Sequence, residues 1–342
     1  MNIQNAIALA VVGENIEFDD MLDVVRAIMS GDATPAQIAG LLVALNMKGE
    51  TIDEVTAAAS VMRELAVSVS VRSAPLIDTC GTGGDSAHTF NISTAAAFVV
   101  AAAGGYVAKH GNRSVSSSSG SADVLEQAGA NIELDPATVA LSIEETGVGF
   151  MFAPAHHGAT RHAVGPRREL GIRTLFNVLG PLTNPAGARL QLVGVFDRRW
   201  QTMVVEVLAR LGTERAFVVN AKDGLDEISN GSVTTVAELR DGEIHWFEID
   251  PREYGFDLQP TSSIVARDAS HSLDTIFKVF NNEPGPAHDI VALNGGAAIY
   301  ICGLASTLAD GIVRAKELLA DGSVGARFER FIKFTQQHRR RP

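Results

Sequence analysis

Several polar segments of the chain hold residue types that could act on a phosphorylated substrate. The first spans residues 78–85 and reads Asp-Thr-Cys-Gly-Thr-Gly-Gly-Asp. Its glycines let the backbone approach a ligand closely and present N–H groups to it. Asn91, Ser93 and Thr94 follow at the expected start of a helix, where N–H groups and the helix dipole favour an anion. The pattern favours a phosphate cradle, and a plain structural turn is the alternative.

The second segment spans residues 109–113, reads Lys-His-Gly-Asn-Arg, and is followed by a run of serines. Lys109 and Arg113 carry positive charges, and together with the amide and the hydroxyls they suit a polyanionic ligand. We expect a strand to end at Ala108, so this segment should lie at the same edge of a sheet as the glycine-rich segment. A solvated polar loop is the alternative interpretation.

The third segment runs from His156 and His157 to Arg167 and Arg168. Imidazole and guanidinium groups favour a surface that binds a planar, anionic substrate, with one arginine donating two parallel hydrogen bonds to a carboxylate. The alternative is that these arginines are surface charges of a helix.

The fourth segment contains the adjacent carboxylates Asp226 and Glu227, in a loop after a predicted strand. Magnesium commonly binds proteins through one or two carboxylates together with substrate phosphates. The pair therefore predicts a magnesium site, although an acidic turn or an acid–base pair is also compatible with it. Taken together, these segments predict chemistry at a phosphorylated sugar rather than hydride transfer or proteolysis.

The elements that position these segments alternate between short β-rich runs and helices from about residue 74 onward. Such alternation predicts a mainly parallel sheet covered by helices, with ligands at loops beyond the carboxyl ends of the strands. A hairpin is expected around Asp241 and Gly242. The predicted strands are 76–78, 106–108, 150–152, 190–196 and 216–219, the hairpin strands are 234–239 and 243–249, and the predicted helices are 93–103, 122–128, 136–146 and 201–211.

The residues before this region are expected to be helical. Apolar residues recur at helical spacing through the first 45 residues, and Thr51 with Glu54 has the spacing of a capping box. We therefore predict an α/β protein with a small helical domain over residues 1–72 and a large α/β domain with a mainly parallel sheet over residues 73–342.

Composition narrows the class of protein. The chain has 342 residues, of which 46% are hydrophobic and 20% charged, as in ordinary globular proteins. Its 40 acidic and 28 basic residues give a formal charge of −12, which opposes binding to a nucleic-acid backbone. Cys80 and Cys302 form neither a disulfide framework nor a metal-ligand pattern. We find no signal peptide and no apolar run that could span a bilayer, so we expect a soluble, cytoplasmic protein without membrane or nucleic-acid partners.

The motifs occur in an order that resembles one enzyme family. Residues 81–85, 91–94, 109–113, 173–182 (Arg-Thr-Leu-Phe-Asn-Val-Leu-Gly-Pro-Leu) and 224–227 together resemble anthranilate phosphoribosyltransferase, over about residues 5 to 320. The resemblance implies transfer of a phosphoribosyl group from 5-phosphoribosyl-1-pyrophosphate to the amine of anthranilate, a step of tryptophan biosynthesis. It also implies a nucleoside phosphorylase type of fold, a homodimer formed through the helical domains, and a segment around 166–180 that returns to the helical domain.

The resemblance also assigns roles to residues of this sequence. Lys109, Asn112 and Arg167 are implied as catalytic residues. Ser93, Asp226 and Glu227 are implied as ligands of Mg²⁺, with two ions in each active site. The donor is implied to contact Gly81, Gly84, Asp85, Thr89, Asn91, Ser93, Thr94, Lys109 and Ser121, and anthranilate to contact Gly81, His110, Asn112, His157 and Arg167.

Two other functions are compatible with this plan. A pyrimidine nucleoside phosphorylase shares the two-domain arrangement, but its phosphate loop reads differently and it does not need the carboxylate pair. A catalytically idle relative that binds nucleic acid is opposed by the charge of −12 and by the presence of Lys109 and Asn112. We therefore expect magnesium-dependent displacement of pyrophosphate at the anomeric carbon, through an oxocarbenium-like transition state.

Overall fold

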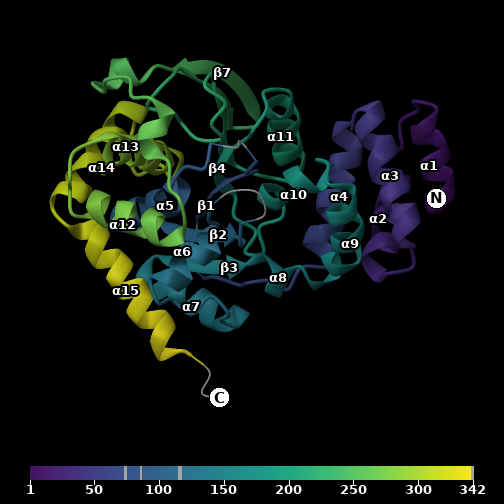
Figure 1. Cartoon of the computed structure of the whole chain (residues 1–342), viewed down its shortest axis with the longest axis horizontal. Coiled ribbons are helices and arrows are strands. Elements are labelled where there is room, and N and C mark those ends of the chain that lie inside the picture. The colour runs from purple at the N-terminus through teal and green to yellow at the C-terminus, as the bar shows by residue number, and fades with distance from the viewer. Residues whose placement is uncertain (73–74, 85–86, 115–117, 340–342) are drawn as a thin grey trace.

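The chain folds into an N-terminal helical bundle and a larger α/β part. The computed structural model describes residues 1–72, 75–84, 87–114 and 118–339. Figure 1 shows the bundle at one end of the molecule and the sheet, with its covering helices, in the middle and at the other end. Within the described ranges no helix is long and apolar enough to cross a membrane.

The bundle begins with helices whose ends are fixed by their sequence. The Thr51 side chain accepts a hydrogen bond from the backbone of Glu54, whose side chain accepts one from the backbone of Thr51, so the predicted capping box is confirmed. Thr34 and Gln37 form a second capping box, with Pro35 at the first helical position. The four helices are α1 (Ile3–Val11), α2 (Phe18–Ser30), α3 (Pro35–Lys48) and α4 (Ile52–Glu64).

The larger part is built on one seven-stranded sheet in the order β3-β2-β1-β4-β5-β6-β7. The first five strands are parallel, and β6 and β7 add an antiparallel hairpin at one edge. The predicted mainly parallel sheet and its hairpin are therefore confirmed. The strands are β1 (Leu76–Gly81), β2 (Tyr106–Gly111), β3 (Val148–Phe152), β4 (Leu190–Gly194), β5 (Arg215–Ala221), β6 (Thr234–Arg240) and β7 (Glu243–Ile249).

Both faces of the parallel strands β1 to β5 are buried, and successive residues of a strand contribute to opposite faces. Along β5, Phe217 and Val219 join the core under α5 and α13, whereas Ala216 and Val218 join the core that continues into the bundle. The helices are α5 (Ile92–Ala102), α6 (Ser121–Gln127), α7 (Pro136–Thr146), α8 (Ala153–His156), α11 (Arg199–Arg210), α12 (Ala269–Phe280), α13 (Pro286–Ile301), α14 (Leu308–Ala320) and α15 (Ser323–Gln337), with 3-10 turns at Gly158–Thr160, Pro251–Tyr254 and Thr261–Ile264.

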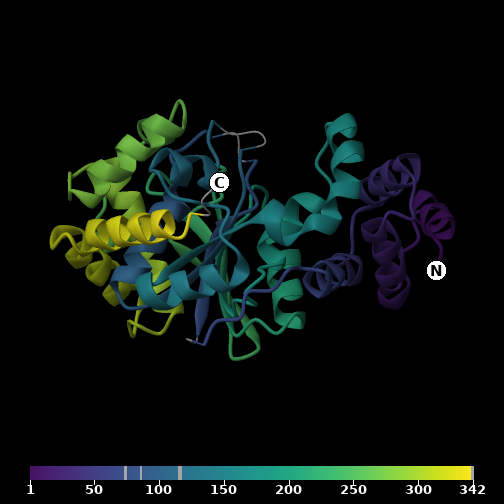
Figure 2. The same cartoon turned by 90° about the horizontal axis from the view of Figure 1, so that it is seen from below.

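Two helices from the middle of the chain connect the bundle with the sheet. Helix α9 (Arg161–Leu170) packs against α2 and α3, and α10 (Phe176–Leu182) packs against α4, α11 and β2. Figure 2 shows the teal segment that contains α9 beside the bundle. The packing is close, since a Cβ on Gly31, which caps the end of α2, would lie 2.7 Å from the His162 ring. These contacts support the prediction that 166–180 returns to the helical domain, and the boundary after residue 72 stays a prediction.

Candidate active site

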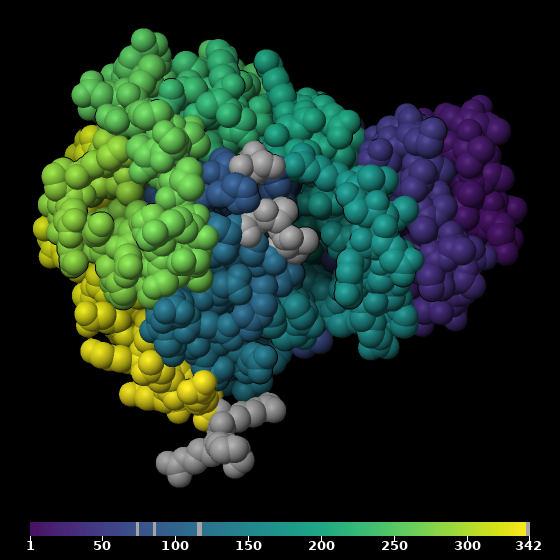
Figure 3. Space-filling model, viewed as in Figure 1, coloured from purple at the N-terminus to yellow at the C-terminus, as the bar shows by residue number. Residues whose placement is uncertain are grey.

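The carboxyl ends of the five parallel strands lie along one edge of the sheet. The strand order reverses between β1 and β4, and ligands of open α/β sheets bind at such a switch point. Gly81 at the end of β1 lies opposite Gly194 at the end of β4. Figure 3 shows blue residues of this region at the surface, between the green segment that contains α12 and the teal segment that contains α9. The glycine-rich segment therefore begins where a ligand is expected.

The loop after β5 that carries Asp226 and Glu227, which we call the acidic loop, folds back onto the end of β1. It contacts residues 81–84, which we define as the glycine loop. The N–H group of Gly83 donates to Asp226 Oδ2 at 2.8 Å. A Cβ on Gly194 would lie only 1.5 Å from the Asp226 carbonyl oxygen, and one on Gly81 would lie 2.4 Å from Asp226 Oδ2. Glycine at 194 is therefore required for the acidic loop to lie against the strand ends, whereas a Cβ at 81 would displace only the carboxylate of Asp226.

Glu227 lies at the start of α5. The N–H group of Ser93, in the first turn of that helix, donates to Glu227 Oε1 at 3.1 Å. The carbonyl of Ser93 accepts from Thr79 Oγ1 at 3.0 Å, which ties the turn to β1. A carboxylate at a helix N-terminus is stabilised by the N–H groups and the dipole. This contact joins two segments that are 134 residues apart in sequence.

Lys109 contacts the same helix start from the other side. Its side chain is almost fully buried, and its ammonium group donates to the Thr79 carbonyl and to Ser93 Oγ at 3.3 Å. Burial lowers the pKa of Lys109, while the nearby carboxylate of Asp78 opposes that shift. We predicted that Lys109 follows a strand ending at Ala108, but the ladder with β3 continues to Gly111. Lys109 is therefore held by the sheet and not by a loop.

Arg113 differs from Lys109 in what it contacts. Its guanidinium forms ion pairs with Asp123, at 3.1 Å, and with Glu126, both on α6. Asp123 also accepts from the N–H groups of Ser114 and Gly120 at 3.0 and 2.8 Å. These hydrogen bonds hold the backbone of Ser114 and of Gly120 against α6. The arginine thus has carboxylate partners of its own, and the expectation that it serves a polyanion finds no support in these contacts.

The predicted donor residues Asn91 and Thr94 flank Ser93. Asn91 Oδ1 accepts from Ser119 Oγ at 2.9 Å and from Ser272 Oγ at 2.7 Å, so the residue links the glycine-rich region to the serine segment and to α12. Thr94 Oγ1 is buried, and among the described residues it has no hydrogen-bond partner. A buried hydroxyl without a partner is costly.

Asn112 and Ser121 are brought together by a close backbone approach. Ser121 Oγ donates to the Asn112 carbonyl at 3.5 Å, and the N–H of Ala122 donates to the same oxygen at 3.2 Å. A Cβ on Gly120 would lie 2.5 Å from that oxygen, so only glycine fits there. Asn112 itself is exposed at the end of β2.

The remaining predicted donor residues are Thr89, Gly84 and Asp85. Thr89, which follows the glycine loop in sequence, forms an isolated antiparallel bridge with Val265. Gly84 has a φ of +83°, which favours glycine. Asp85 lies outside the described residues.

Two neutral imidazoles lie beyond Lys109. The rings of His110 and His157 are 5.0 Å apart between centroids. Burial lowers the pKa of His110 to about 3 and that of His157 to about 4, so neither carries a charge at neutral pH. His110 Nδ1 lies 3.1 Å from the Gly180 carbonyl and must donate to it, which leaves Nε2 as an acceptor. Among the described residues the Nε2 atoms of both rings are buried without a partner.

Arg167 lies on α9, beside the bundle. Its guanidinium carbon is 5.1 Å from the centre of the Phe176 ring, and burial lowers its pKa. Phe176 begins α10, the helix whose Gly180 contacts His110. The helix pair α9 and α10 therefore connects the arginine with the imidazole pair.

Sequence reasoning missed a buried network behind the imidazoles. Asp78 is fully buried in β1, and its carboxylate accepts from the His110 N–H at 3.2 Å and from Asn184 Nδ2 at 2.8 Å. Asn184 also donates to the Ala108 carbonyl at 2.8 Å. Burial raises the pKa of Asp78 to about 6. An aspartate inside a predicted buried strand was the available signal, because such a charge needs partners.

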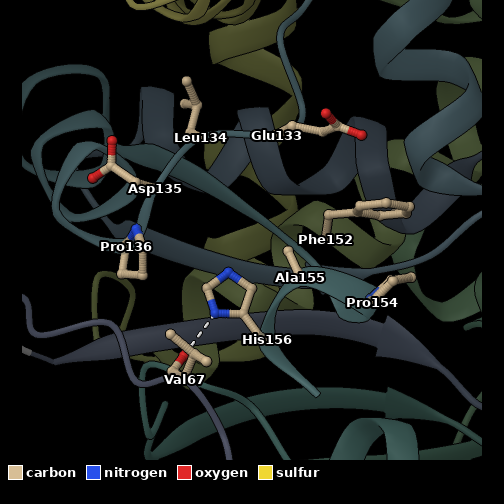
Figure 4. A pocket seen from close by; sticks show the side chains of 9 residues that line it. All are labelled: Val67, Glu133, Leu134, Asp135, Pro136, Phe152, Pro154, Ala155 and His156. Atoms are coloured by element: carbon tan, nitrogen blue, oxygen red, sulfur yellow. Dashed lines mark hydrogen bonds between the residues drawn. The ribbon is translucent and has the colours of Figure 1, made fainter. Parts of the chain in front are cut away.

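A separate pocket of about 470 Å³ lies beside the end of β3. Figure 4 shows the hydrogen bond between His156 Nδ1 and the Val67 carbonyl at its wall, and the carboxylates of Glu133 and Asp135 around it. The residues that line this pocket are Val67, Glu133, Leu134, Asp135, Pro136, Phe152, Pro154, Ala155 and His156. Of these residues only His156 belongs to a segment that we predicted to bind substrate, and none has a role implied by the resemblance, so the pocket and the site at the β1–β4 edge are different places.

Comparison with known proteins identifies the family. Residues 4–66 match the helical bundle domain of the glycosyl transferase family, and residues 73–324 match its a/b domain. An anthranilate phosphoribosyltransferase from Thioalkalivibrio sulfidiphilus is 56% identical over 98% of this chain and 99% of its own length. The enzyme of that name from Alkalilimnicola ehrlichii is 54% identical over 98% of this chain and 100% of its own. The chain belongs to the anthranilate phosphoribosyltransferase family.

Solved structures of anthranilate phosphoribosyltransferases share the fold. The enzyme from Thermus thermophilus is 42% identical and superimposes with a TM-score of 0.91 over 97% of this chain and 99% of its own. The Saccharomyces cerevisiae enzyme, solved in complex with PRPP and Mg, is 23% identical with a TM-score of 0.89 over 98% of both chains. The predicted α/β class with an N-terminal helical bundle is thus confirmed for this family member.

Proposed function

We propose that the chain transfers the phosphoribosyl group of 5-phosphoribosyl-1-pyrophosphate to the amine of anthranilate, giving N-(5-phosphoribosyl)anthranilate and pyrophosphate. One observation carries the proposal: a buried lysine and a carboxylate meet at the start of α5, and a second carboxylate contacts the glycine loop, at the switch point of the sheet. Lys109 and Glu227 both contact Ser93, and Asp226 contacts Gly83. Full-length relatives that carry the name of this enzyme support the same reaction.

The donor would bind along this edge through N–H groups, hydroxyls and one ammonium. The ammonium of Lys109, a residue of β2, is held by the Thr79 carbonyl of β1 and by Ser93 Oγ of α5, so it offers positive charge at a fixed place. Pre-positioned charge of this kind stabilises an anionic leaving group more than mobile charge does. We assign to the donor Gly81, Gly84, Asp85, Thr89, Asn91, Ser93, Thr94, Lys109 and Ser121.

The carboxylates fit Mg²⁺ and fit a closed transition-metal site poorly. Asp226 and Glu227 supply hard oxygen ligands, and Ser93 adds a hydroxyl at the same helix start. Across the residues that the structure describes, no three His, Cys, Asp or Glu side chains gather to hold a metal. Magnesium commonly binds through few carboxylates and completes its shell with substrate phosphates. We propose that Ser93, Asp226 and Glu227 would hold two ions, which would neutralise charge on the pyrophosphate.

Anthranilate would bind on the side of the imidazoles. Arg167 can pair with its carboxylate, and Gly81, Asn112 and His157 would line its path. The unprotonated Nε2 of His110 can accept a hydrogen bond, and the amine of anthranilate can donate one. The role of the buried imidazoles is to orient the amine nitrogen.

The reaction breaks the bond between the anomeric carbon and the pyrophosphate oxygen and forms a bond from that carbon to the amine nitrogen. The amine then loses a proton, and pyrophosphate leaves with the electron pair of the broken bond. An aromatic amine needs little deprotonation before attack, so we assign no dedicated base. Holding both substrates in line can contribute on the order of 7 kcal/mol to lowering the barrier. In this scheme Lys109, Asn112 and Arg167 are the catalytic residues.

We propose that the protein acts as a homodimer in the cytoplasm. The bundle exposes apolar side chains that suit a protein contact, with 69%, 71% and 83% of Val11, Val12 and Met47 accessible. The free thiols of Cys80 and Cys302 agree with a reducing compartment. Sedimentation that gives a monomer mass at micromolar concentration would remove the dimer from this proposal.

A fluorescence assay tests the proposed function. Anthranilate emission is followed after addition of 5-phosphoribosyl-1-pyrophosphate, first with magnesium and then with excess chelator. We expect loss of emission that needs both the donor and magnesium. A chain that leaves the emission unchanged but converts thymidine and phosphate would be a nucleoside phosphorylase instead.

A further inference from the structure

Arg173 connects parts of the molecule that the proposed function treats separately. It lies between α9 and α10, and its side chain is exposed. One guanidinium nitrogen, Nη2, donates to the carbonyl of Gly84 in the glycine loop. The guanidinium carbon also lies 3.9 Å from the centre of the Phe196 ring, in the segment after β4. A planar cation can make both contacts at once, by hydrogen bonding in its plane and stacking on its face.

The backbone of Arg173 is fixed by the bundle. Its carbonyl accepts from Asn46 Nδ2 of α3 at 2.8 Å. The next residue, Thr174, donates its N–H to Asn177 Oδ1 at 2.9 Å, which holds the start of α10. The position of the guanidinium therefore follows the position of the bundle, while its hydrogen bond ends on the glycine loop.

The glycine loop has several independent attachments. The Thr82 N–H donates to the Gly194 carbonyl at 2.9 Å, and Thr82 Oγ1 accepts from the Phe196 N–H at 3.2 Å. Gly83 donates to Asp226. These contacts fix Thr82 and Gly83 against β4 and the acidic loop, and Arg173 holds the carbonyl of Gly84, the last residue of the glycine loop.

The space around Gly84 agrees with this role. A Cβ there would lie 3.2 Å from Arg173 Nη2, and the φ of +83° also disfavours a side chain. The guanidinium thus packs directly on the backbone of the loop. Loss of the arginine would remove the contact that orients the carbonyl of Gly84.

We propose that Arg173 is a positioning residue for the donor: it holds the glycine loop in the geometry that receives pyrophosphate, from a backbone anchored on the bundle. The inference rests on the proposed function, because it assigns the loop to the donor. It predicts an effect on the donor and not on anthranilate, although Arg173 is only six residues from Arg167 in sequence.

The test uses Arg173→Ala, Arg173→Lys and Phe196→Leu, with Arg168→Ala as a control that removes a neighbouring exposed cation. Binding of 5-phosphoribosyl-1-pyrophosphate with magnesium is measured by titration calorimetry, and KM of each substrate is measured by fluorescence. For Arg173→Ala we expect donor Kd and KM to rise at least tenfold, with anthranilate KM within twofold and an unchanged melting temperature. Arg173→Lys keeps the charge but loses the flat stacking surface, so it should restore donor binding only in part. Phe196→Leu should also raise the donor Kd and KM.

The outcomes separate the two claims. Donor binding by Arg173→Ala within twofold of wild type overturns the inference, as does an equal rise in both KM values. A wild-type chain that does not bind the donor overturns the proposed function itself. A tenfold donor effect in Arg168→Ala would show that general positive charge matters and would also overturn the inference.

Discussion

Gly194→Ala is expected to displace the acidic loop from the active site. The added Cβ would lie 1.5 Å from the Asp226 carbonyl oxygen, 2.3 Å from its carbonyl carbon and 3.0 Å from its Cα. All three are backbone atoms, so no side-chain rotation relieves the overlap. Gly194 also pairs with Gly81 and Val219 in the middle of the sheet, so its own backbone is held on both sides. The residue that moves is therefore Asp226, with Glu227 attached to it.

The size of the effect follows from this geometry. An ordinary contact begins near 3.4 Å, so the loop must retreat by about 2 Å from its 1.5 Å position. A misplacement of about 1 Å can cost roughly 100-fold in rate. We therefore expect kcat/KM to fall at least about 100-fold, which corresponds to about 2.7 kcal/mol at the transition state. Overpacking of this kind should destabilise the fold by only about 1–3 kcal/mol.

The assay follows anthranilate fluorescence over a range of magnesium concentrations, with thermal unfolding in parallel. In Gly81→Ala the added Cβ meets only the end of the Asp226 side chain, at 2.4 Å. The fall in kcat/KM should therefore be smaller, about tenfold. Gly325→Ala on α15 is the control, because its nearest atoms are at 3.7 and 3.8 Å, and it should keep full activity with about 0.5–1 kcal/mol of added stability. A folded Gly194→Ala enzyme with wild-type turnover and magnesium requirement would refute the reasoning.

Three further changes test individual assignments. Replacing Asp226 with Asn and Glu227 with Gln should lower turnover about 100-fold or more and raise the magnesium requirement; an unchanged magnesium response counts against the metal assignment. Arg167→Ala should raise the anthranilate KM about tenfold more than the donor KM, and an equal rise in both would contradict its role. Burial lowers the pKa of His157 to about 4, so the folded state resists protonation and loses stability as pH falls from about 6.5 toward 4. Denaturant unfolding at pH 7 and pH 5 should therefore show a pH effect about 2 kcal/mol larger in wild type than in His157→Gln; equal pH effects would mean that this imidazole is not buried as a neutral group.

Much of the fold was predictable because local rules and tertiary structure agree. The strands of the parallel sheet are buried on both faces, so they read as short apolar runs between glycine turns. The capping box of Thr51 and Glu54 marks the start of α4 in the sequence. The strand boundary at Ala108 was wrong, since polar Lys109 and His110 continue β2. A lysine that hydrogen-bonds within the sheet does not look like a strand residue in the sequence.

The site was predictable as a set of motifs and not as a set of contacts. That Gly83 donates to Asp226 depends on the loop after β5 crossing the ends of β1 and β4, which spacing in the sequence does not reveal. For the same reason the ion pairs of Arg113 with α6 and the reach of Arg173 to Gly84 were not foreseen. Charge and residue type indicated which side chains suit a phosphate, whereas tertiary packing decided which of them already have partners.

The central claim is that the protein transfers the phosphoribosyl group to anthranilate. The ratio of pyrophosphate released to anthranilate consumed tests it most directly. Wild-type protein, magnesium, anthranilate and 5-phosphoribosyl-1-pyrophosphate are combined, and anthranilate consumed and pyrophosphate released are measured in the same sample. We predict one pyrophosphate for each anthranilate and no pyrophosphate when anthranilate is left out. Pyrophosphate release that does not depend on anthranilate, or no release at high enzyme concentration, would contradict the account.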